Sequence, residues 1–150
     1  MLKPEIVGDA SDPATAHLAV VVEFYQAIHR LDPTGVLDTL APDFIGHVSQ
    51  GFPGGLGGRY RGAQAMMDRV WLPVMATFAA LPHPERIYHA GVDTVIAIGD
   101  YRGVVPSTGR SMTAAFAHII QVVDGTITEL RQITDTNQWA AGLHDPAPND

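Results

Sequence analysis

The chain of 150 residues contains no cysteine, which excludes disulfides and thiolate chemistry. Basic residues are few: nine Lys and Arg stand against sixteen Asp and Glu, for a formal net charge of -7. This balance disfavours non-specific binding to nucleic acid, which requires clustered cations. Long hydrophobic runs are also lacking, and residues 18–22 are far too few to span a membrane. With no secretory signal at the N-terminus, we expect a soluble protein of the cytoplasm.

The composition is that of a folded protein, with 46% hydrophobic and 17% charged residues. A chain of this length is expected to form one domain, residues 1–150, with a single substantial core over about 14–143. Residues 1–11 mix Gly, Pro and Asp without periodicity, so both termini are expected to be loose.

Two Asp-Pro pairs, at 12–13 and 32–33, each predict the start of a helix. Aspartate accepts a hydrogen bond at the N-cap, and proline tolerates the first turn because its missing N–H has no partner there. The apolar spacing extends the first helix to about Leu31, and the second helix is short and ends at Pro42.

A strand over 43–49 follows, and then a glycine-rich segment, 51–58. This segment lacks the lysine and the Ser/Thr of a phosphate-binding loop, so we interpret it as a mobile loop beside a pocket. A third helix is expected over 62–78, kinked or shortened by Pro73.

The rest of the chain is rich in strand patterns, which are followed by one short helix. The expected strands cover 85–90, 94–105, 110–123 and 126–134. Short connections favour antiparallel pairing, and Asp124-Gly125 is a strong signal for a hairpin. Helices followed by a run of strands predict an α+β fold, in which helices cover one face of a curved antiparallel sheet.

His118 lies in the middle of an otherwise apolar strand face, where a polar ring needs a hydrogen-bond partner. A two-residue turn in the hairpin would pair His118 with Arg131. A three-residue turn, with Gly125 in a left-handed bulge, would pair it with Leu130 and bring Gln132 to its face. We favour the second register because it leaves the charged residues of the last strand in solvent.

This order of elements resembles the NTF2-like superfamily, in particular SnoaL-like and ketosteroid-isomerase-like proteins. The resemblance rests on VVEFYQAIHRLDPTGVLDTLAPDFIGH, the helix that ends near Phe78, and HIIQVVDGTITELRQITDTNQW. It implies a cone-shaped sheet wrapped around a long helix, a cystatin-like α+β barrel whose interior is a ligand pocket. The same fold carries isomerases, cyclases, dehydratases, epoxide hydrolases and non-catalytic domains.

Three polar residues are the candidate catalytic groups. His118 lies where ketosteroid-isomerase-like enzymes place an acid that hydrogen-bonds an enolate, although it could also be a core histidine satisfied by Gln132 or water. His47 follows PDFIG, where SnoaL-like proteins often have histidine, and an imidazole suits a general base. Gln132 departs from the resemblance, because SnoaL-like cyclases commonly carry a proton-moving aspartate there and an amide cannot ionise.

Other residues are expected to complete an apolar pocket. The predicted substrate-binding residues are Tyr25, Met67, Trp71, Phe116, Ile120, Leu130 and Thr134. Asp135 and Arg59 are further possibilities, although a helix cap and a solvated loop charge are the simpler interpretations. The spacing of the histidines indicates no metal site, and no cofactor is expected.

The sequence thus leads to a hypothesis of acid/base chemistry on a carbonyl-bearing, polyketide- or steroid-like molecule. His47 would move the proton while His118 and Gln132 hold the oxyanion. The alternatives are a non-catalytic ligand-binding or dimerisation module and, more weakly, an epoxide hydrolase, which would need a carboxylate in the pocket. The predicted partners are a small apolar organic ligand and a second copy of the chain, and neither nucleic acid nor a membrane is expected. The second copy is predicted because the outer face of the sheet is unusually apolar.

Overall fold

The computed structural model describes residues 2–8 and 12–144. The helices are α1 (Asp12–His29), α2 (Pro33–Asp38), α3 (Ala63–Met66), α4 (Leu72–Phe78) and α5 (Thr136–Gly142), with a 3-10 turn η1 (Pro53–Gly55) and a π-helical segment η2 (Met67–Trp71). The strands are β1 (Glu5–Val7), β2 (Leu40–Val48), β3 (Gly58–Arg61), β4 (Ala80–His89), β5 (Thr94–Val104), β6 (Ser111–Val123) and β7 (Thr126–Thr134).

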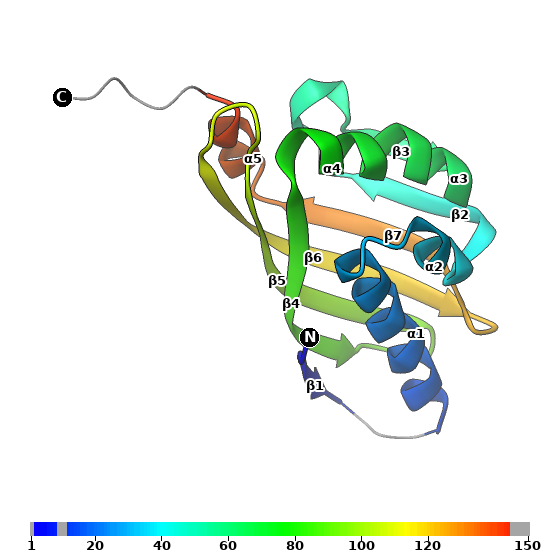
Figure 1. Cartoon of the computed structure of the whole chain (residues 1–150). Coiled ribbons are helices and arrows are strands. Elements are labelled where there is room, and N and C mark those ends of the chain that lie inside the picture. The colour runs from blue at the N-terminus through cyan, green and yellow to red at the C-terminus, as the bar shows by residue number, and fades with distance from the viewer. Residues whose placement is uncertain (1, 9–11, 145–150) are drawn as a thin grey trace.

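The strands form one seven-stranded sheet in the order β1-β4-β5-β6-β7-β2-β3. The sheet curves without closing, and α1 to α4 lie on its concave side (Figure 1). Each helix therefore buries its apolar stripe against a single sheet face. The predicted α+β fold, with a curved sheet around a long helix, is confirmed.

Two edge strands escaped the sequence analysis. β1 pairs in parallel with β4 through Glu5–Val7, so the prediction of a loose tail over residues 1–11 is wrong for this part. The last residue of the glycine-rich segment begins β3, Gly58–Arg61, which pairs with β2. A strand of three or four residues is too short for its alternation to stand out from a loop. The C-terminal tail after His144 lies outside the described residues.

The third helix is divided as its proline suggested, but the disturbance begins one turn earlier. α3, η2 and α4 follow one another without a break, and the π-helical segment precedes Pro73. A π-helical turn accommodates one extra residue and is frequently found at functional sites. Met67, Val70 and Trp71, all within it, border the cavity described below.

The β6–β7 hairpin reaches the expected faces by an unexpected route. Its turn has two residues, with positive φ at both Asp124 (51°) and Gly125 (78°), so the favoured three-residue turn is wrong. The bulge lies further along, where Gln121 pairs with Glu129 and Val122 with Ile127, which leaves Thr128 as the extra residue. The bulge shifts β7 by one residue, so that His118 pairs with Gln132.

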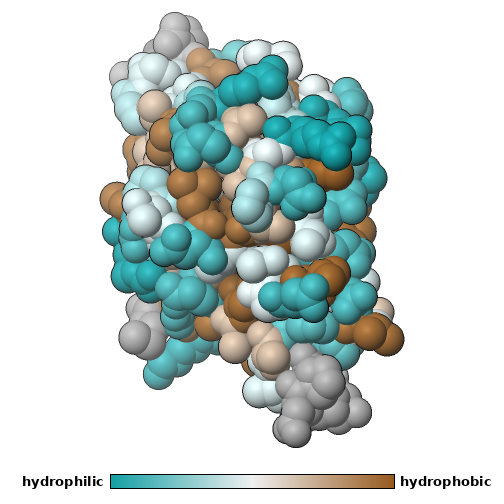
Figure 2. Space-filling view, turned by 90° about the vertical axis from the view of Figure 1, so that its right-hand side faces the viewer, coloured by the Kyte–Doolittle hydropathy of each residue, from teal (hydrophilic) through white to brown (hydrophobic). Residues whose placement is uncertain are grey.

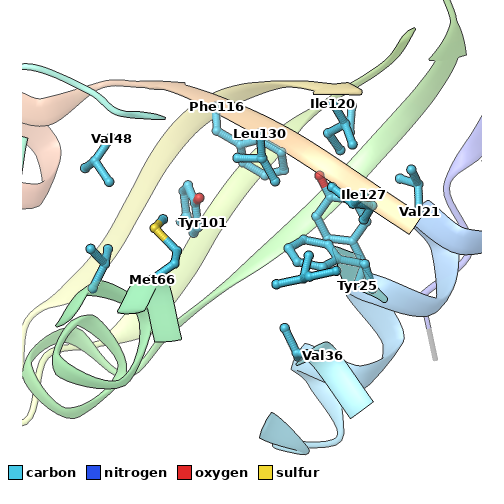
Figure 3. Close-up of a cluster of buried hydrophobic side chains, with 14 of the residues drawn as sticks. Val21, Tyr25, Val36, Val48, Met66, Tyr101, Phe116, Ile120, Ile127 and Leu130 are labelled. Carbon is cyan, nitrogen blue, oxygen red and sulfur yellow. The ribbon is translucent and has the colours of Figure 1, made fainter. Parts of the chain in front are cut away.

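The core is formed by the concave sheet face, α1 and the α3–α4 helix, as Figure 3 shows for part of it. Trp139 of α5 is fully buried against Phe52, Phe78 and Tyr101 and closes one end. On the side shown in Figure 2, hydrophobic residues reach the surface in separate patches among hydrophilic ones. None of the helices in the described part of the chain is long and apolar enough to cross a membrane. The homodimer remains a prediction.

Candidate functional site

A cavity of about 300 Å³ lies between the concave sheet face and the helices. Its walls are mostly apolar and come from α1, the α1–α2 connection, the α3–α4 helix, the start of β4, and α5. Among the described residues that border it, the side chains with polar groups are Asp32, Tyr101, His118, Gln132 and Trp139. An apolar cavity with a few polar groups is the usual anatomy of a small-molecule site.

His118 is held between two tyrosines from different elements. The Tyr25 hydroxyl of α1 lies 2.6 Å from Nδ1 of His118, and the Tyr101 hydroxyl of β5 lies 2.7 Å from Nε2. Figure 3 shows the two tyrosines in the same interior. Phe116 stacks on the imidazole with ring centroids 4.1 Å apart. The ring is 3% exposed, and both of its nitrogens are used inside the protein.

Gln132 joins this cluster to the backbone of the neighbouring strand. Its Oε1 accepts a hydrogen bond from the backbone N–H of Ser49, at 3.3 Å, and its Nε2 donates to the Tyr101 hydroxyl at 3.0 Å. A backbone N–H can only donate, so the amide is oriented without ambiguity. The Ser49 hydroxyl in turn donates to the backbone carbonyl of Gln132 at 2.9 Å.

These partners determine where the protons lie. Among the described residues, His118 is the only hydrogen-bond partner of the buried Tyr25 hydroxyl. The Tyr25 O–H therefore donates to Nδ1, because it would otherwise be buried without an acceptor. Nε2 then carries the ring proton and donates to Tyr101. The Tyr101 oxygen accepts from both His118 and Gln132, which leaves its own O–H free to donate into the cavity.

Burial keeps the whole cluster uncharged. It lowers the pKa of His118 to about 3, because the imidazolium would be desolvated. It also raises the pKa of Tyr25 and of Tyr101; the hydrogen bond from Gln132 opposes the rise at Tyr101 only in part. His118 is therefore neutral near pH 7 and is poorly matched to proton transfer. Tyr101 is a hydrogen-bond donor that does not readily ionise.

His47 lies outside the cavity, so its predicted inward position is wrong. Side chains alternate along β2, and Phe44, Gly46 and Val48 are the buried positions. His47 is on the other face, where its Nε2 lies 2.5 Å from a carboxylate oxygen of Glu129. His47 is therefore a partly solvated residue near the end of its strand, with 18% of its side chain exposed.

The structure places the other predicted site residues in three groups. Met67, Trp71, Leu130, His118 and Gln132 border the cavity. Four others lie close to the cavity without bordering it. Tyr25 on α1 and Phe116 on β6 contact His118, and Ile120 is in the core. The Thr134 hydroxyl accepts a hydrogen bond from the Trp139 indole. Asp135 and Arg59 also lie away from the cavity, with Asp135 at the N-cap of α5.

The sequence analysis missed Tyr101 and the position of Asp32 at the cavity. Tyr101 pairs with Ala114 in the sheet, so its contact with His118 runs diagonally and could not be found from the alternation of one strand. Asp32 was expected to cap α2, and its Oδ1 does accept a hydrogen bond from the backbone N–H of Gly35 at 3.0 Å. Its place between two helices also puts it on the cavity wall.

No metal site is found in the described part of the chain, because no three His, Asp or Glu side chains gather closely enough there. The polar groups that border the cavity are instead the hydrogen-bonding groups of one phenol, one imidazole, one amide, one indole and one carboxylate. This arrangement can hold an uncharged molecule through an acceptor atom at Tyr101.

The chain belongs to the SnoaL-like domain family, whose model matches residues 21–130. An NTF2-like protein from Burkholderia thailandensis E264 is 29% identical, with a TM-score of 0.76 over 88% of this chain and 97% of that one. An NTF2-like protein of unknown function from Burkholderia pseudomallei K96243 is 28% identical, with a TM-score of 0.76 over 84% of this chain and 95% of that one.

A third structure, TerC co-crystallized with polyporic acid, is 22% identical, with a TM-score of 0.74 over 84% of this chain and 96% of that one. At this identity the similarity shows the fold alone. None of the curated proteins matches the chain. The membership therefore agrees with the resemblance to SnoaL-like and NTF2-like proteins, and leaves the substrate to be argued from the cavity.

We expect His118 to be protonated at Nε2 and not at Nδ1 in the free protein near neutral pH. The reason is that Tyr25 has no other described acceptor for its proton. ¹⁵N NMR of the histidine side chains distinguishes the two tautomers, and the resonance is assigned from its loss in His118→Gln. An Nδ1-protonated ring would contradict the proton arrangement and would direct the Tyr101 proton at the imidazole.

The neutral His118 should make the protein less stable in acid. Between about pH 6.5 and about pH 3 the unfolded histidine binds a proton and the folded one does not, so stability falls as the pH falls through this window. The contribution is at most about 1.4 kcal/mol per pH unit. Urea unfolding across this range should give a shallower pH dependence for His118→Gln than for the wild type, while the exposed His144→Gln should not alter the slope.

Proposed function

We propose that the protein is an enzyme that binds a small apolar molecule by its carbonyl oxygen and transfers a proton at the neighbouring carbon. The observation that carries the proposal is the position of the Tyr101 hydroxyl on the wall of a mostly apolar cavity, with His118 and Gln132 as its partners, which by the proton arrangement above leaves its O–H available to a ligand. Polyketide- or steroid-like ketones have this combination of an apolar body and a carbonyl. Isomerisation, cyclisation and dehydration can each proceed through the same enol or enolate.

In the proposed step a base removes a proton from the carbon next to the carbonyl. The electrons of that C–H bond form a carbon–carbon double bond, and the carbonyl π electrons move to oxygen. Tyr101 stabilises the resulting oxyanion by donating its hydrogen bond. His118 and Gln132 donate to the phenol oxygen and thereby strengthen it as a donor. Because these donors are fixed in advance, little reorganisation accompanies the charge movement.

Asp32 is the group we propose as the base. It is the only carboxylate among the described residues that border the cavity. Its side chain is 42% exposed, so it lies at the opening. One oxygen caps α2, and Arg30 approaches the other at 3.7 Å. Asparagine caps a helix as well as aspartate does, so Asp32→Asn removes the charge and keeps the cap.

The comparisons support an enzyme only in general terms. Solved structures with the same fold include a proposed polyketide cyclase from Xanthomonas campestris pv. campestris, at 20% identity. Epoxide hydrolysis is less favoured than enolisation. It needs a carboxylate that activates water in the pocket, and Asp135 does not border the cavity.

A non-catalytic ligand-binding module is the second candidate, and one observation favours it. His118 and Gln132 use their polar groups within the protein, and Asp32 already accepts a helix-capping hydrogen bond. If Asp32 is only a cap, the cavity recognises a carbonyl without changing it. The two functions therefore share the same binding mode and differ in proton transfer.

Carbonyl recognition is tested with α-tetralone and tetralin, which differ mainly in the carbonyl group. We expect α-tetralone to bind about fivefold more tightly, as one buried neutral hydrogen bond provides about 1 kcal/mol. Tyr101→Phe should bring the ratio close to one, and Tyr60→Phe, a buried tyrosine away from the cavity, should preserve it. Calorimetry measures both affinities, and an unchanged ratio in Tyr101→Phe would overturn the proposal.

Proton transfer is tested by exchange of the α-protons of α-tetralone in D₂O, followed by NMR. The wild type should accelerate the exchange at neutral pD, and Tyr101→Phe and Asp32→Asn should each slow it at least tenfold, since each removes one group used in the transition state. Binding of α-tetralone without any acceleration of exchange would assign the protein to the non-catalytic class.

A further inference from the structure

The opening of the cavity is bordered by apolar side chains that are exposed to solvent. Leu31 and Leu72 both border the cavity, yet they are 62% and 45% exposed. Pro33 is also exposed and borders it. A residue that lines a cavity and is accessible from outside lies at its opening. We call Leu31, Pro33 and Leu72 the apolar rim.

The backbone holds this rim in place from two directions. Leu31 has a φ of 54°, a left-handed backbone conformation that residues other than glycine seldom adopt. Its N–H donates to the carbonyl of Ile28, and the N–H of Asp32 donates to that of Ala27, so the turn after α1 is closed by hydrogen bonds. Leu72 begins α4 directly after the π-helical segment. Leu31 therefore lies in an ordered turn, and Leu72 lies within a continuous helical segment.

The hydrogen-bond donor and the apolar rim lie at different depths of the site. The hydrogen-bond donor, Tyr101, is 9% exposed and lies inside, whereas the apolar rim lies at the opening. The cavity itself, about 300 Å³, is at the lower limit for small-molecule sites. A ligand that is longer than the cavity would leave it across the rim and remove apolar surface of Leu31 and Leu72 from water.

We infer that the substrate carries an uncharged apolar chain that extends out of the cavity and lies on the apolar rim. The carbonyl end of this substrate is inferred from the proposed function, whereas its apolar chain is inferred from the rim alone. Asp32 lies at the same opening with a half-exposed carboxylate, and the protein has a formal net charge of -7. Both charges oppose an anionic tail and an anionic membrane surface, and Arg30, 3.7 Å from the Asp32 carboxylate, opposes a cationic tail, so a neutral chain is the occupant.

The test measures how affinity depends on chain length, with straight-chain methyl ketones from methyl propyl ketone to methyl nonyl ketone. Each added methylene that enters the cavity should tighten binding about fourfold. For chains that reach the opening we expect a continued gain of about twofold per methylene in the wild type. In Leu31→Ser/Leu72→Ser the gain should stop at that length. The readout is the ratio of long- to short-chain affinity within each variant.

Val92→Ser is the matched control, because Val92 is 82% exposed and does not border the cavity. It should keep the full chain-length dependence. The inference is overturned if the gain ends at the same length in the wild type and the double variant. It is also overturned if the two leucines are needed for co-sedimentation with phosphatidylcholine vesicles, which would assign the rim to a lipid surface. A chain-length effect with no preference for α-tetralone over tetralin would instead reject only the proposed function.

Discussion

The site depends on one constraint: an imidazole is buried where it cannot be charged. His118 is in the middle of a sheet face whose neighbours are apolar, so its neutral form is favoured strongly. A neutral imidazole needs one donor and one acceptor, and α1 and β5 supply them as Tyr25 and Tyr101. This pairing connects the long helix to the sheet, and it sets the direction in which the phenol at the cavity can donate.

The bulge at Thr128 makes this arrangement possible. A regular hairpin with the observed two-residue turn would place Glu129 and Arg131 on the face of His118, and two charges would then be buried. The one-residue shift brings Leu130 and Gln132 there instead. The cost of burying charge thus predicts the right face for Gln132, but the shift comes from the bulge and not from the turn. Turn and bulge have the same effect on the alternation, so the sequence does not distinguish them.

The sequence predicts those parts of the site that depend on alternation within one strand, and fails where a contact runs diagonally between neighbouring strands. His118 and Gln132 were expected on the inner face and are found there. His47 was placed inside on the strength of a resemblance, although Phe44 and Val48 already fix the inner face of its strand. Tyr101 on β5 contacts His118 on the neighbouring strand β6 diagonally, since its own partner in the pairing is Ala114. The fold itself was predictable, because its helices and long strands have strong periodic patterns and standard starts.

Gln132 has an amide, which cannot ionise, and this determines what the cluster can do. A carboxylate beside Tyr101 would accept the phenol proton and turn it away from the cavity, whereas the amide donates to the phenol oxygen and leaves that proton available. The cluster is therefore suited to stabilise negative charge on a bound oxygen and unsuited to remove a proton. Any proton acceptor must come from elsewhere in the cavity wall, and the carboxylate available in the described part of that wall is Asp32, at the opening. A ketone whose oxygen is at Tyr101 and whose α-carbon faces the opening would meet the Asp32 carboxylate there, and the rest of the molecule would continue towards the apolar rim.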